Sequence, residues 1–488
     1  MTLLTPAQAQ RAFLLLTATR WFPVGLVVTV TTLLPLERGL SVTQALTALS
    51  VTGLTVFFLE LPTSGLADSL GRRPLLVLAA VLQVAAAVLF LTAHSFWAFA
   101  LAAAVTGAFR ALDSGPLEAW FVDTVHATEP GADVDRPLAA HSTVLGVSIA
   151  TGALVSGGLV WWHPLDAWSA LTLPYAVYAI LAVAHLVAVT VLVRETPRIL
   201  APAARTDADT PADTDAETNG PGVTPALPPS DTGGTRVAGR VLESARQAPG
   251  VIRDGLRLAR DNRVLRWLLL VEVFWSVGMV VFETFQPIRL SEMLGGTAAG
   301  AAVAGPAAAA GWAVFAGGAA LTGLVTPRLG VARTAILARV LNGLGAVWMG
   351  LALGPVGLVA AYLVTYGLHG ACGPAYQALL HREAESRNRS TVLSMASMVA
   401  FAAFSLAGPA LGWAADLLST SAAMVLAGAF STLGAACFLP AVRRERMLAA
   451  RAAADATSTA STSTSTSTAT ATATATEDAD VTTTTSAV

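Results

Sequence analysis

Residues 65–73 read GLADSLGRR, a short charged stretch between two apolar runs at 41–62 and 74–93. Glycine at positions 65 and 71 permits the close backbone approach of a tight turn. Each flanking run has the about 20 apolar residues that a helix needs to cross ~30 Å of hydrocarbon. The charges of Asp68, Arg72 and Arg73 are costly inside lipid, so they mark a membrane surface. The stretch therefore predicts a turn between two membrane-spanning helices.

The whole chain has the composition of a multi-pass membrane protein. Of its 488 residues, 54% are hydrophobic and only 12% are charged, whereas soluble domains carry about 25% charged residues. The net charge of −2 does not favour a nucleic-acid partner. Cys372 and Cys437 lie in apolar runs, which is typical of buried free thiols rather than of a disulfide or metal site. We predict an all-α integral membrane protein in contact with the lipid bilayer, with no bound metal.

Twelve runs are long and apolar enough to span the membrane, in two groups of six. The first group lies at 12–35, 41–62, 74–93, 95–122, 138–162 and 170–193, and the second at 264–290, 299–326, 334–353, 355–379, 391–414 and 419–440. The sequence therefore predicts an N-terminal six-helix bundle over 1–194 and a C-terminal six-helix bundle over 263–442, numbered here as spans one to twelve.

The segments outside the two bundles have a different composition. Residues 195–262 form a predicted cytoplasmic linker, in which 203–235 is rich in Asp, Thr, Pro and Gly and reads as disordered. An amphipathic helix is expected near 237–263, where Arg alternates with apolar residues. The tail at 443–488 contains a Ser-Thr-Ala repeat and is predicted to be disordered.

The distribution of arginine predicts the orientation in the membrane. All basic residues are Arg, and the alternate loops on one side hold most of the loop arginines, whereas the loops on the other side hold only Arg38 and Arg289. Because basic loops stay in the cytoplasm, both termini are expected there. The absence of Lys and the abundance of Ala suggest a GC-rich genome, so we expect the plasma membrane of a bacterium.

The two halves repeat each other, and the repeat leads to a family. Gly115-Pro116 reappears as Gly373-Pro374, and Gly65-Leu66 as Gly323-Leu324. The 65–73 loop, the twelve spans and the parallel repeat resemble the major facilitator superfamily, and the Glu-Leu-Pro-Thr at 60–63 resembles a variant seen in its multidrug-efflux members. The resemblance implies a transporter fold of two six-helix pseudo-repeats, a site between them and a monomer.

The resemblance also assigns a cytoplasmic gating motif. Its members in this sequence are Gly65, Asp68, Gly71, Arg72, Arg73 and Asp123. Asp68 is placed to face the N-terminus of span eleven, and Arg72 to pair with Asp68 and Asp123. In the family such a cluster latches the cytoplasmic side in the outward-open state. The alternative is that the arginines only anchor the topology.

Charged residues inside the N-terminal bundle suggest proton coupling. They are Arg20, Glu60, Arg110, Asp113 and Glu118, and Arg110 is placed like the family's buried span-four arginine. Charges at this depth must pair or line a wet cavity. We hypothesise that Arg20 pairs with Glu60 or Glu118, and that one of these acids takes a proton when the pair breaks. The alternative is a static ion pair.

Spans one, four, seven and ten line the cavity in this family. Glu272 and Glu283 are 11 residues apart, about 20° from the same helix face, so both are expected to face the cavity and to favour a cationic or amphipathic substrate. A pair between Glu283 and Arg289 is the alternative for Glu283. The aromatic residues could stack on a flat apolar substrate, although a single aromatic residue in a span more often serves packing or an interface belt. The cavity candidates are Trp21, Trp120, Glu272, Trp275, Glu283, Gln286, Tyr366 and Tyr376.

Small residues in spans five and eleven resemble the family's antiporter signature, although span five lacks its proline. They are Gly152, Gly157, Gly158, Gly408, Pro409 and Gly412. In the family's antiporters this region bends and seals against ion leak. Close helix packing alone is the other reading.

The remaining patterns narrow the function. Without any Lys there is no Walker loop, so ATP-driven export by this chain is excluded, and no motif indicates an enzyme. We expect a secondary active transporter that works by alternating access, with proton-coupled export of a small amphipathic or drug-like molecule, no cofactor and the proton gradient as driving force. Proton-coupled uptake of a metabolite and a non-transporting membrane sensor are the alternatives.

Overall fold

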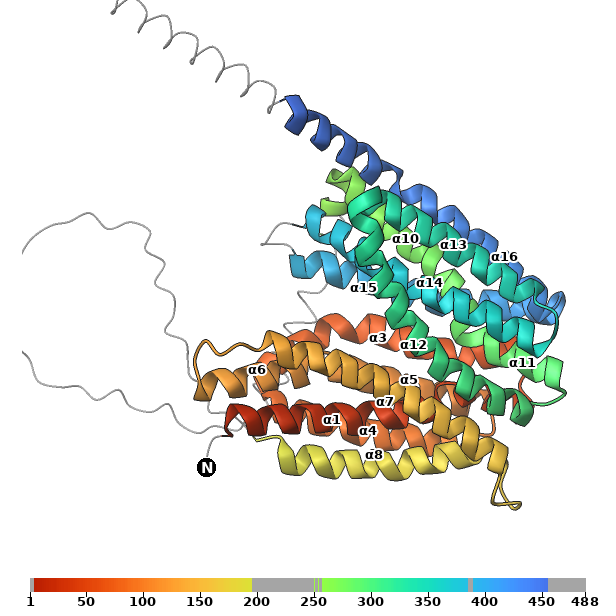
Figure 1. The fold of residues 1–488 in the computed structure, drawn as a ribbon. Coiled ribbons are helices and arrows are strands. Elements are labelled where there is room, and N and C mark those ends of the chain that lie inside the picture. The colour runs from red at the N-terminus through yellow and green to blue at the C-terminus, as the bar shows by residue number, and fades with distance from the viewer. Residues whose placement is uncertain (1–3, 195–249, 251–252, 254–256, 385–388, 455–488) are drawn as a thin grey trace, which may run out of the picture.

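The computed structural model describes residues 4–194, 250, 253, 257–384 and 389–454, apart from the side chains of 61–70 and 390. The regular structure of this part of the chain is entirely helical (Figure 1). It contains twelve helical spans that are long and apolar enough to cross a membrane. The predicted all-α fold with twelve spans is confirmed.

The N-terminal half places its six spans in eight helices, because spans one and four are each interrupted. The helices are α1 (Pro6–Val27), α2 (Val30–Glu37), α3 (Val42–Leu70), α4 (Arg72–Thr92), α5 (Phe96–Asp113), α6 (Pro116–Thr128), α7 (Asp135–Trp162) and α8 (Thr172–Leu192). Span one combines α1 and α2, and span four combines α5 and α6.

The C-terminal half repeats this plan with its own irregularities. Its elements are α10 (Arg263–Val280), the π-helical turn η1 (Val281–Phe285), α11 (Gln286–Leu294), α12 (Thr297–Leu329), α13 (Val331–Leu351), α14 (Gly354–Glu383), α15 (Arg389–Leu417), α16 (Thr420–Leu433) and the 3-10 turn η2 (Gly434–Phe438). Span seven runs from α10 through η1 to α11.

Short polar signals set the helix ends. Thr5 and Ser41 each form a capping box with the glutamine three residues later, which satisfies backbone N–H groups that a helix start leaves open. Gly71 is the only residue between α3 and α4, and its φ of 88° lies in the region that favours glycine. The GLADSLGRR stretch therefore contains the tight turn that we predicted, although its first six residues belong to α3.

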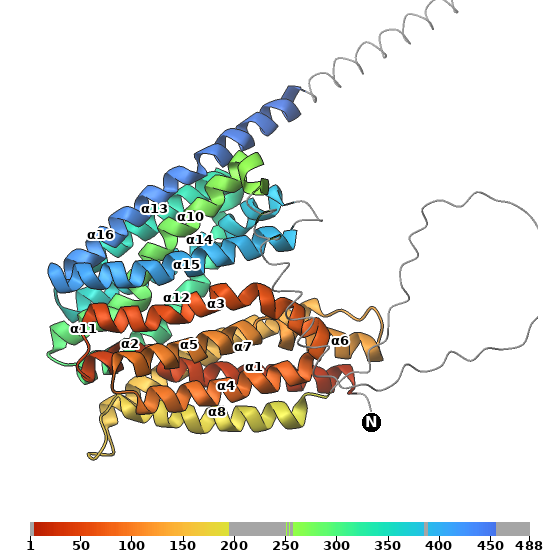
Figure 2. The same ribbon diagram turned by 180° about the vertical axis from the view of Figure 1, so that it is seen from behind.

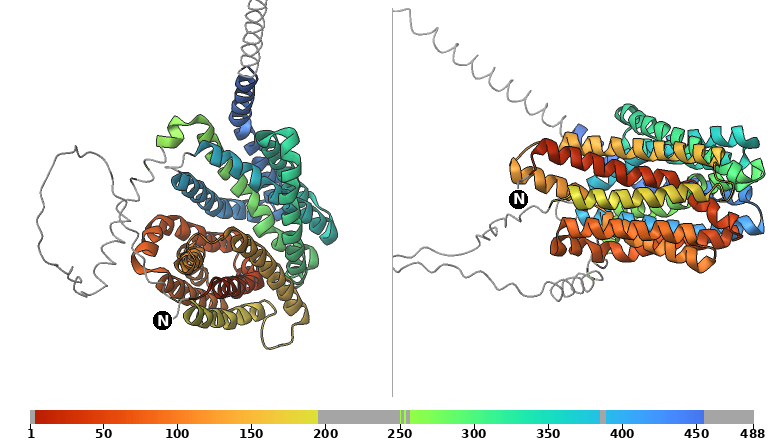
Figure 3. Two further views of the ribbon diagram at one scale, coloured as in Figure 1. Left: turned by 60° about the vertical axis from the view of Figure 1, so that its left-hand side comes forward. Right: turned by 90° about the horizontal axis from the view of Figure 1, so that it is seen from below.

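The two halves lie side by side as separate groups of helices (Figure 3). Between them α3 packs along α15, and α7 packs along α12. The first described residues and the helix that follows span twelve lie at one end of the bundle, called here the termini end. The opposite end, called the hairpin end, holds the turns at 38–41, 163–171 and 295–296. The halves meet at the hairpin end and diverge toward the termini end (Figures 1 and 2).

The structure differs from the predicted boundaries after span twelve. The helix continues to residue 454, so 443–454 is not part of a disordered tail. Ala, Arg and Glu dominate this stretch and favour helix. Glu445 also accepts hydrogen bonds from the Ala332 backbone N–H (3.2 Å) and from Arg382 (2.6 Å). These bonds tie the extension to the start of α13 and the end of α14.

Most of the predicted linker lies outside the described residues, including 203–235 and the greater part of the expected amphipathic helix. Residues 257–261 are helical, and Ala259 is buried against the apolar cluster at the start of α10. The end of that predicted helix therefore packs on the C-terminal half.

Candidate functional site

Span four breaks in its middle, next to an acid. α5 ends at Asp113, Gly115 has φ of 90°, and α6 begins with Pro116. Glycine tolerates this left-handed conformation, and proline suits the first position of a helix because it needs no N–H there. Ser114 and Gly115 are both exposed. Irregular backbone at membrane depth is tolerated where it is buried in protein or lines a wet cavity.

Asp113 forms the central ion pair of the N-terminal half. Its Oδ2 lies 2.7 Å from Nε of Arg20, and the two side chains are 16% and 5% exposed. The Arg20 guanidinium also lies over the rings of Phe109, at 4.1 Å, and Trp21, at 4.7 Å. The partner of Arg20 is thus Asp113, rather than Glu60 or Glu118 as we expected. The end of α5 at Asp113 puts its carboxylate beside span one.

The other acids of this half have separate surroundings. Glu118 lies in the first turn of α6, where its Oε1 is 3.6 Å from Nε2 of His141. His141 is buried and stacks on Phe13, with 4.9 Å between ring centroids. Glu60 is partly buried on α3. The Arg20–Asp113 pair is therefore distinct from the Glu118–His141 contact.

Arg110 lies between the two halves. Its guanidinium is 5.8 Å from the ring of Phe401, which belongs to α15 of the C-terminal half. Although Arg110 is in the interior of span four, it is exposed. The Arg110 guanidinium thus reaches from α5 to α15 of the opposite half.

In the C-terminal half, a π-helical turn in span seven carries Glu283. The Tyr366 hydroxyl donates a 2.8 Å hydrogen bond to Glu283 Oε1, which joins span seven to span ten. Single π-turns inside α-helices occur frequently at functional sites because they redirect side chains. Arg289, the alternative partner of Glu283, pairs instead with Glu292 at 2.8 Å.

Five rings lie around Tyr366, the hydrogen-bond partner of Glu283. His369 has its ring centroid 4.8 Å from that of Phe282 and 5.4 Å from that of Phe315. Trp312, on α12, lies 6.3 Å from Tyr366. We call this set the aromatic box; its members are Phe282, Trp312, Phe315, Tyr362, Tyr366 and His369. Its residues come from spans seven, eight and ten. Most of them were not predicted from the sequence, because the sequence does not show how each helix is rotated about its axis.

A second buried polar group lies toward the termini end of the box. Trp275 donates from Nε1 to Nδ1 of His369 at 3.3 Å, and the Arg339 guanidinium lies 5.1 Å from the Trp275 ring. Glu272 is 4% exposed and Arg339 is 1% exposed. Arg339 was not among the predicted site residues. The signal that could have identified it is a charged residue within an apolar run, because charges at membrane depth are rare and functional.

Three predicted cavity residues lie within packed regions of the described chain. Trp120 is 1% exposed and donates from Nε1 to the Arg194 carbonyl at 2.9 Å. The Tyr376 hydroxyl donates to the Leu268 carbonyl at 3.2 Å, and Gln286 is 2% exposed. The structure therefore does not bring these three residues into the aromatic box. Trp21, by contrast, contacts Arg20.

Two arginines of the gating motif make contacts with other residues of the N-terminal half. Arg72 Nε lies 3.4 Å from Asp123 Oδ2, with the two side chains 28% and 54% exposed. Arg73 donates to the Thr190 carbonyl at 3.0 Å, which ties α4 to α8. Gly65 lies in α3, and the Asp68 side chain falls outside the described residues. The contacts seen for Arg72 and Arg73 stay within the N-terminal half.

The glycines of spans five and eleven permit close helix contacts. A Cβ at Gly152 would lie 2.3 Å from the Phe22 carbonyl of α1, and one at Gly157 would lie 2.5 Å from Pro306 of α12. A Cβ at Gly412 would lie 2.9 Å from Thr43 of α3. Gly408 has more room, Gly158 meets no atom within 4 Å, and Pro409 lies inside α15.

An acid at the hairpin end clasps the two halves together. Asp416, near the end of α15, accepts from the backbone N–H of Val42 at 3.2 Å and of Thr43 at 2.9 Å, and from the Thr43 hydroxyl at 2.6 Å. These groups form the start of α3, where open N–H groups and the helix dipole favour a carboxylate. We call this contact the Asp416 clasp. The sequence analysis did not identify it.

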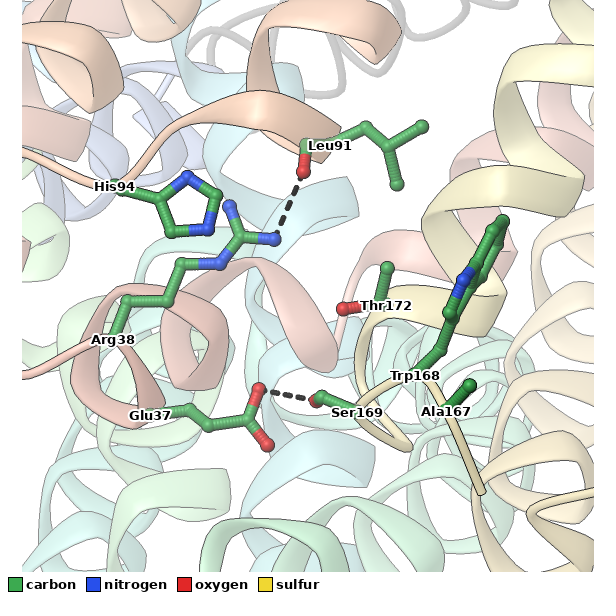
Figure 4. Close-up of a pocket in the computed structure, with 8 residues that line it drawn as sticks. All are labelled: Glu37, Arg38, Leu91, His94, Ala167, Trp168, Ser169 and Thr172. Carbon is green, nitrogen blue, oxygen red and sulfur yellow. Dashed lines mark hydrogen bonds between the residues drawn. The ribbon is translucent and has the colours of Figure 1, made fainter. Parts of the chain in front are cut away.

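A smaller pocket opens at the hairpin end of the N-terminal half (Figure 4). It has a volume of about 530 Å³ and is lined by Glu37, Arg38, Leu91, His94, Ala167, Trp168, Ser169 and Thr172. Arg38 donates to the Phe90 and Leu91 carbonyls at 3.0 and 2.9 Å, and Glu37 accepts from the Ser169 hydroxyl at 2.6 Å. Arg38 thus binds the end of α4 and Glu37 binds the turn at 163–171, and all residues that line the pocket belong to the N-terminal half.

The comparisons with known proteins agree with this fold. The family model described as Major Facilitator Superfamily matches residues 13–407. The chain belongs to the major facilitator superfamily. It is therefore a transporter rather than an enzyme. No curated protein matches the sequence.

Solved structures of transporters have the same fold at low identity. The nucleoside transporter NupG superposes with a TM-score of 0.66 at 11% identity, covering 88% of this chain and 98% of its own. A peptide transporter POT in complex with sulfate gives 0.63 at 14% identity, covering 90% and 94%. A POT family transporter in complex with a thioalcohol-conjugated peptide gives 0.61 at 13%, covering 89% and 96%.

Proposed function

We propose that this transporter is a proton-coupled exporter of small amphipathic molecules in a bacterial plasma membrane, with both termini in the cytoplasm. The observation that carries the proposal is the Arg20–Asp113 pair at the break in span four. The two side chains are 5% and 16% exposed, and in the opposite half the aromatic box and Glu283 offer an apolar surface with an acid. A proton site and a binding surface on opposite halves suit coupling by alternating access.

Alternating access requires the two ends to open in turn. In this structure the Asp416 clasp joins the halves at the hairpin end, and the ribbons diverge at the termini end. With cytoplasmic termini this is an inward-facing arrangement. The gating motif, with its partly exposed Arg72–Asp123 pair, closes in the opposite state. A monomer is sufficient for this cycle, because both halves belong to one chain.

Proton exchange is assigned to Asp113. Its carboxylate lies 2.7 Å from Nε of Arg20, which supplies a counter-charge. When spans one and four rearrange within the N-terminal half and the pair separates, the carboxylate loses its counter-charge in a poorly solvated place and takes a proton. The proton leaves when the pair forms again. Transport and proton movement are then linked through one ion pair.

Uptake of a polar metabolite is the second candidate. It is favoured by the structural neighbours, whose names describe transporters of nucleosides and peptides, and by the exposed Arg110 between the halves. The direction of transport distinguishes this candidate, uptake, from the proposed export.

The test uses purified protein in proteoliposomes of known orientation, with an imposed pH gradient and labelled compounds of both classes. The proposal predicts that amphipathic compounds move from the cytoplasmic face against the proton flow. Asp113→Asn is expected to lose accumulation but keep exchange of substrate for substrate, and Asp166→Asn, on an exposed loop, is the matched control. Accumulation by Asp113→Asn equal to the wild type would overturn the coupling assignment, and movement only of polar metabolites inward would favour uptake.

A further inference from the structure

Glu283 is an acid with no cationic partner in the described part of the chain. Its contact there is the hydrogen bond from Tyr366, and the nearest arginine in sequence, Arg289, is paired with Glu292. An ionised carboxylate at membrane depth is costly unless a positive charge or a wet cavity compensates for it. Glu283 is partly exposed, as are His369 and Trp312. The carboxylate is therefore accessible to a cation that enters between the halves.

The rings around this acid are arranged to receive the same charge. Phe282 and Tyr366 meet edge to face at 90°, with centroids 5.8 Å apart, and Tyr362 lies 5.2 Å from Tyr366. Aromatic faces attract cations through their quadrupole, most strongly where water is excluded. Phe282, Tyr362 and Tyr366 are 2%, 3% and 5% exposed. They form the dry wall of the box, whereas its partly exposed rings border the open space.

The box lies at the boundary between the two halves. A Cβ at Gly146, on α7 of the N-terminal half, would lie 4.0 Å from the Trp312 ring. The Arg339 guanidinium lies 5.1 Å from the Trp275 ring, and the residue is 1% exposed, so this positive charge is buried. The partly exposed residues of the site include one acid, Glu283, and the rings of Trp312 and His369.

We propose that the aromatic box and Glu283 bind an organic cation with a bulky apolar body. The charge of the ligand lies against the Glu283 carboxylate, which Tyr366 holds in place, and its apolar groups pack on Trp312 and Phe315. An anion of the same shape is rejected because it meets an uncompensated carboxylate. The inference rests on the proposed function, whose substrate class it narrows from amphipathic molecules to cations.

The experiment compares two ions of matched size and shape and opposite charge. Displaceable binding of labelled tetraphenylphosphonium and of tetraphenylborate is measured on the purified full-length protein. The wild type is expected to bind the cation and not the anion. Glu283→Gln, which is nearly isosteric, is expected to weaken cation binding about 10-fold or more, which corresponds to the lower end of the coupling measured for close charge pairs. Glu37→Gln, in the separate pocket at the hairpin end, is the matched control and keeps wild-type binding.

A second variant covers the case in which Glu283→Gln does not fold. Trp312→Leu keeps the acid and removes one ring, and it is expected to weaken cation binding about 2- to 30-fold. Equal binding of the two ions, unchanged cation binding in Glu283→Gln, or no displaceable cation binding by folded wild type would overturn the site.

The site and the proposed function fail in different ways. If the protein binds the cation only when Glu283 is present, but moves neither compounds nor protons in proteoliposomes, the proposed site stands and the proposed function is overturned. Proton-coupled export of neutral compounds by a protein that does not bind the cation keeps the function and overturns the site.

Discussion

Removal of the Asp416 clasp should shift the protein toward a state that is open at the hairpin end. Asp416 makes three hydrogen bonds to the start of α3, at 2.6, 2.9 and 3.2 Å. Loss of such a cap costs about 0.5–2 kcal/mol. Because Asp416 is exposed to solvent, we expect the lower part of this range, about 0.5–1 kcal/mol. Since these bonds join the two halves, the loss falls on the state closed at the hairpin end.

A free-energy change of this size is measurable as a change in the populations of the hairpin-open and hairpin-closed states. At 1.4 kcal/mol for a factor of ten, Asp416→Ala should raise the ratio of hairpin-open to hairpin-closed protein about 2- to 5-fold. Spin labels at His94 and Leu353, exposed turn residues of opposite halves at this end, report the separation by pulsed dipolar spectroscopy. The two buried cysteines are first replaced by alanine.

The control is an acid at the same end whose bonds stay within one half. Glu292 pairs with Arg289 and accepts from Thr420, so Glu292→Gln should leave the distance distribution unchanged. An unchanged distribution in Asp416→Ala, with the protein folded and the label pair responsive to substrate, would refute the clasp. A shift of equal size in the distance distribution of Glu292→Gln would show that loss of any acid at the hairpin end favours the open state, and that the effect is not specific to the Asp416 clasp.

Further predictions concern packing, the gating motif and the helix after span twelve. Gly412→Leu should reduce transport more than tenfold in a folded protein, because a Cβ there would already lie 2.9 Å from Thr43; normal transport would contradict the packing. Arg72→Ala should change thermal stability little, because exposed pairs contribute only about 0–1 kcal/mol, while it slows transport by weakening the link to Asp123; a large fall in the thermal midpoint would contradict this. Glu445→Ala removes a cap on α13, worth about 1 kcal/mol, and should lower the unfolding midpoint by about 2–4 °C; an unchanged midpoint in a fluorescence melt would show that the extension is not stabilising.

The spans and their turns were predictable because they depend on local chemistry. Apolar length alone sets the number of crossings, and a glycine with positive φ between two helices marks a turn, as at Gly71. The break in span four also had a local signal, since Gly115 followed by Pro116 is a common start of a helix. We predicted a continuous span there because apolar residues continue on both sides.

The partners of the charged residues were less predictable. We expected Arg20 to meet Glu60 or Glu118, yet its partner is Asp113, three residues past Arg110 and beside the break. The choice depends on the rotation and bending of helices, which the pattern of residues does not encode. For the same reason the π-turn at Glu283 and the ring contacts of Trp312 were not found. The Asp416 clasp joins residues more than 370 positions apart, and no local pattern relates them.

The most direct test of proton coupling through Asp113 is substrate-evoked proton movement, followed with a pH-sensitive dye trapped in proteoliposomes. The account predicts a pH change on addition of an exported compound to the wild type and to Asp166→Asn, and none with Asp113→Asn. An equal pH change with Asp113→Asn would contradict it and place the proton on another residue.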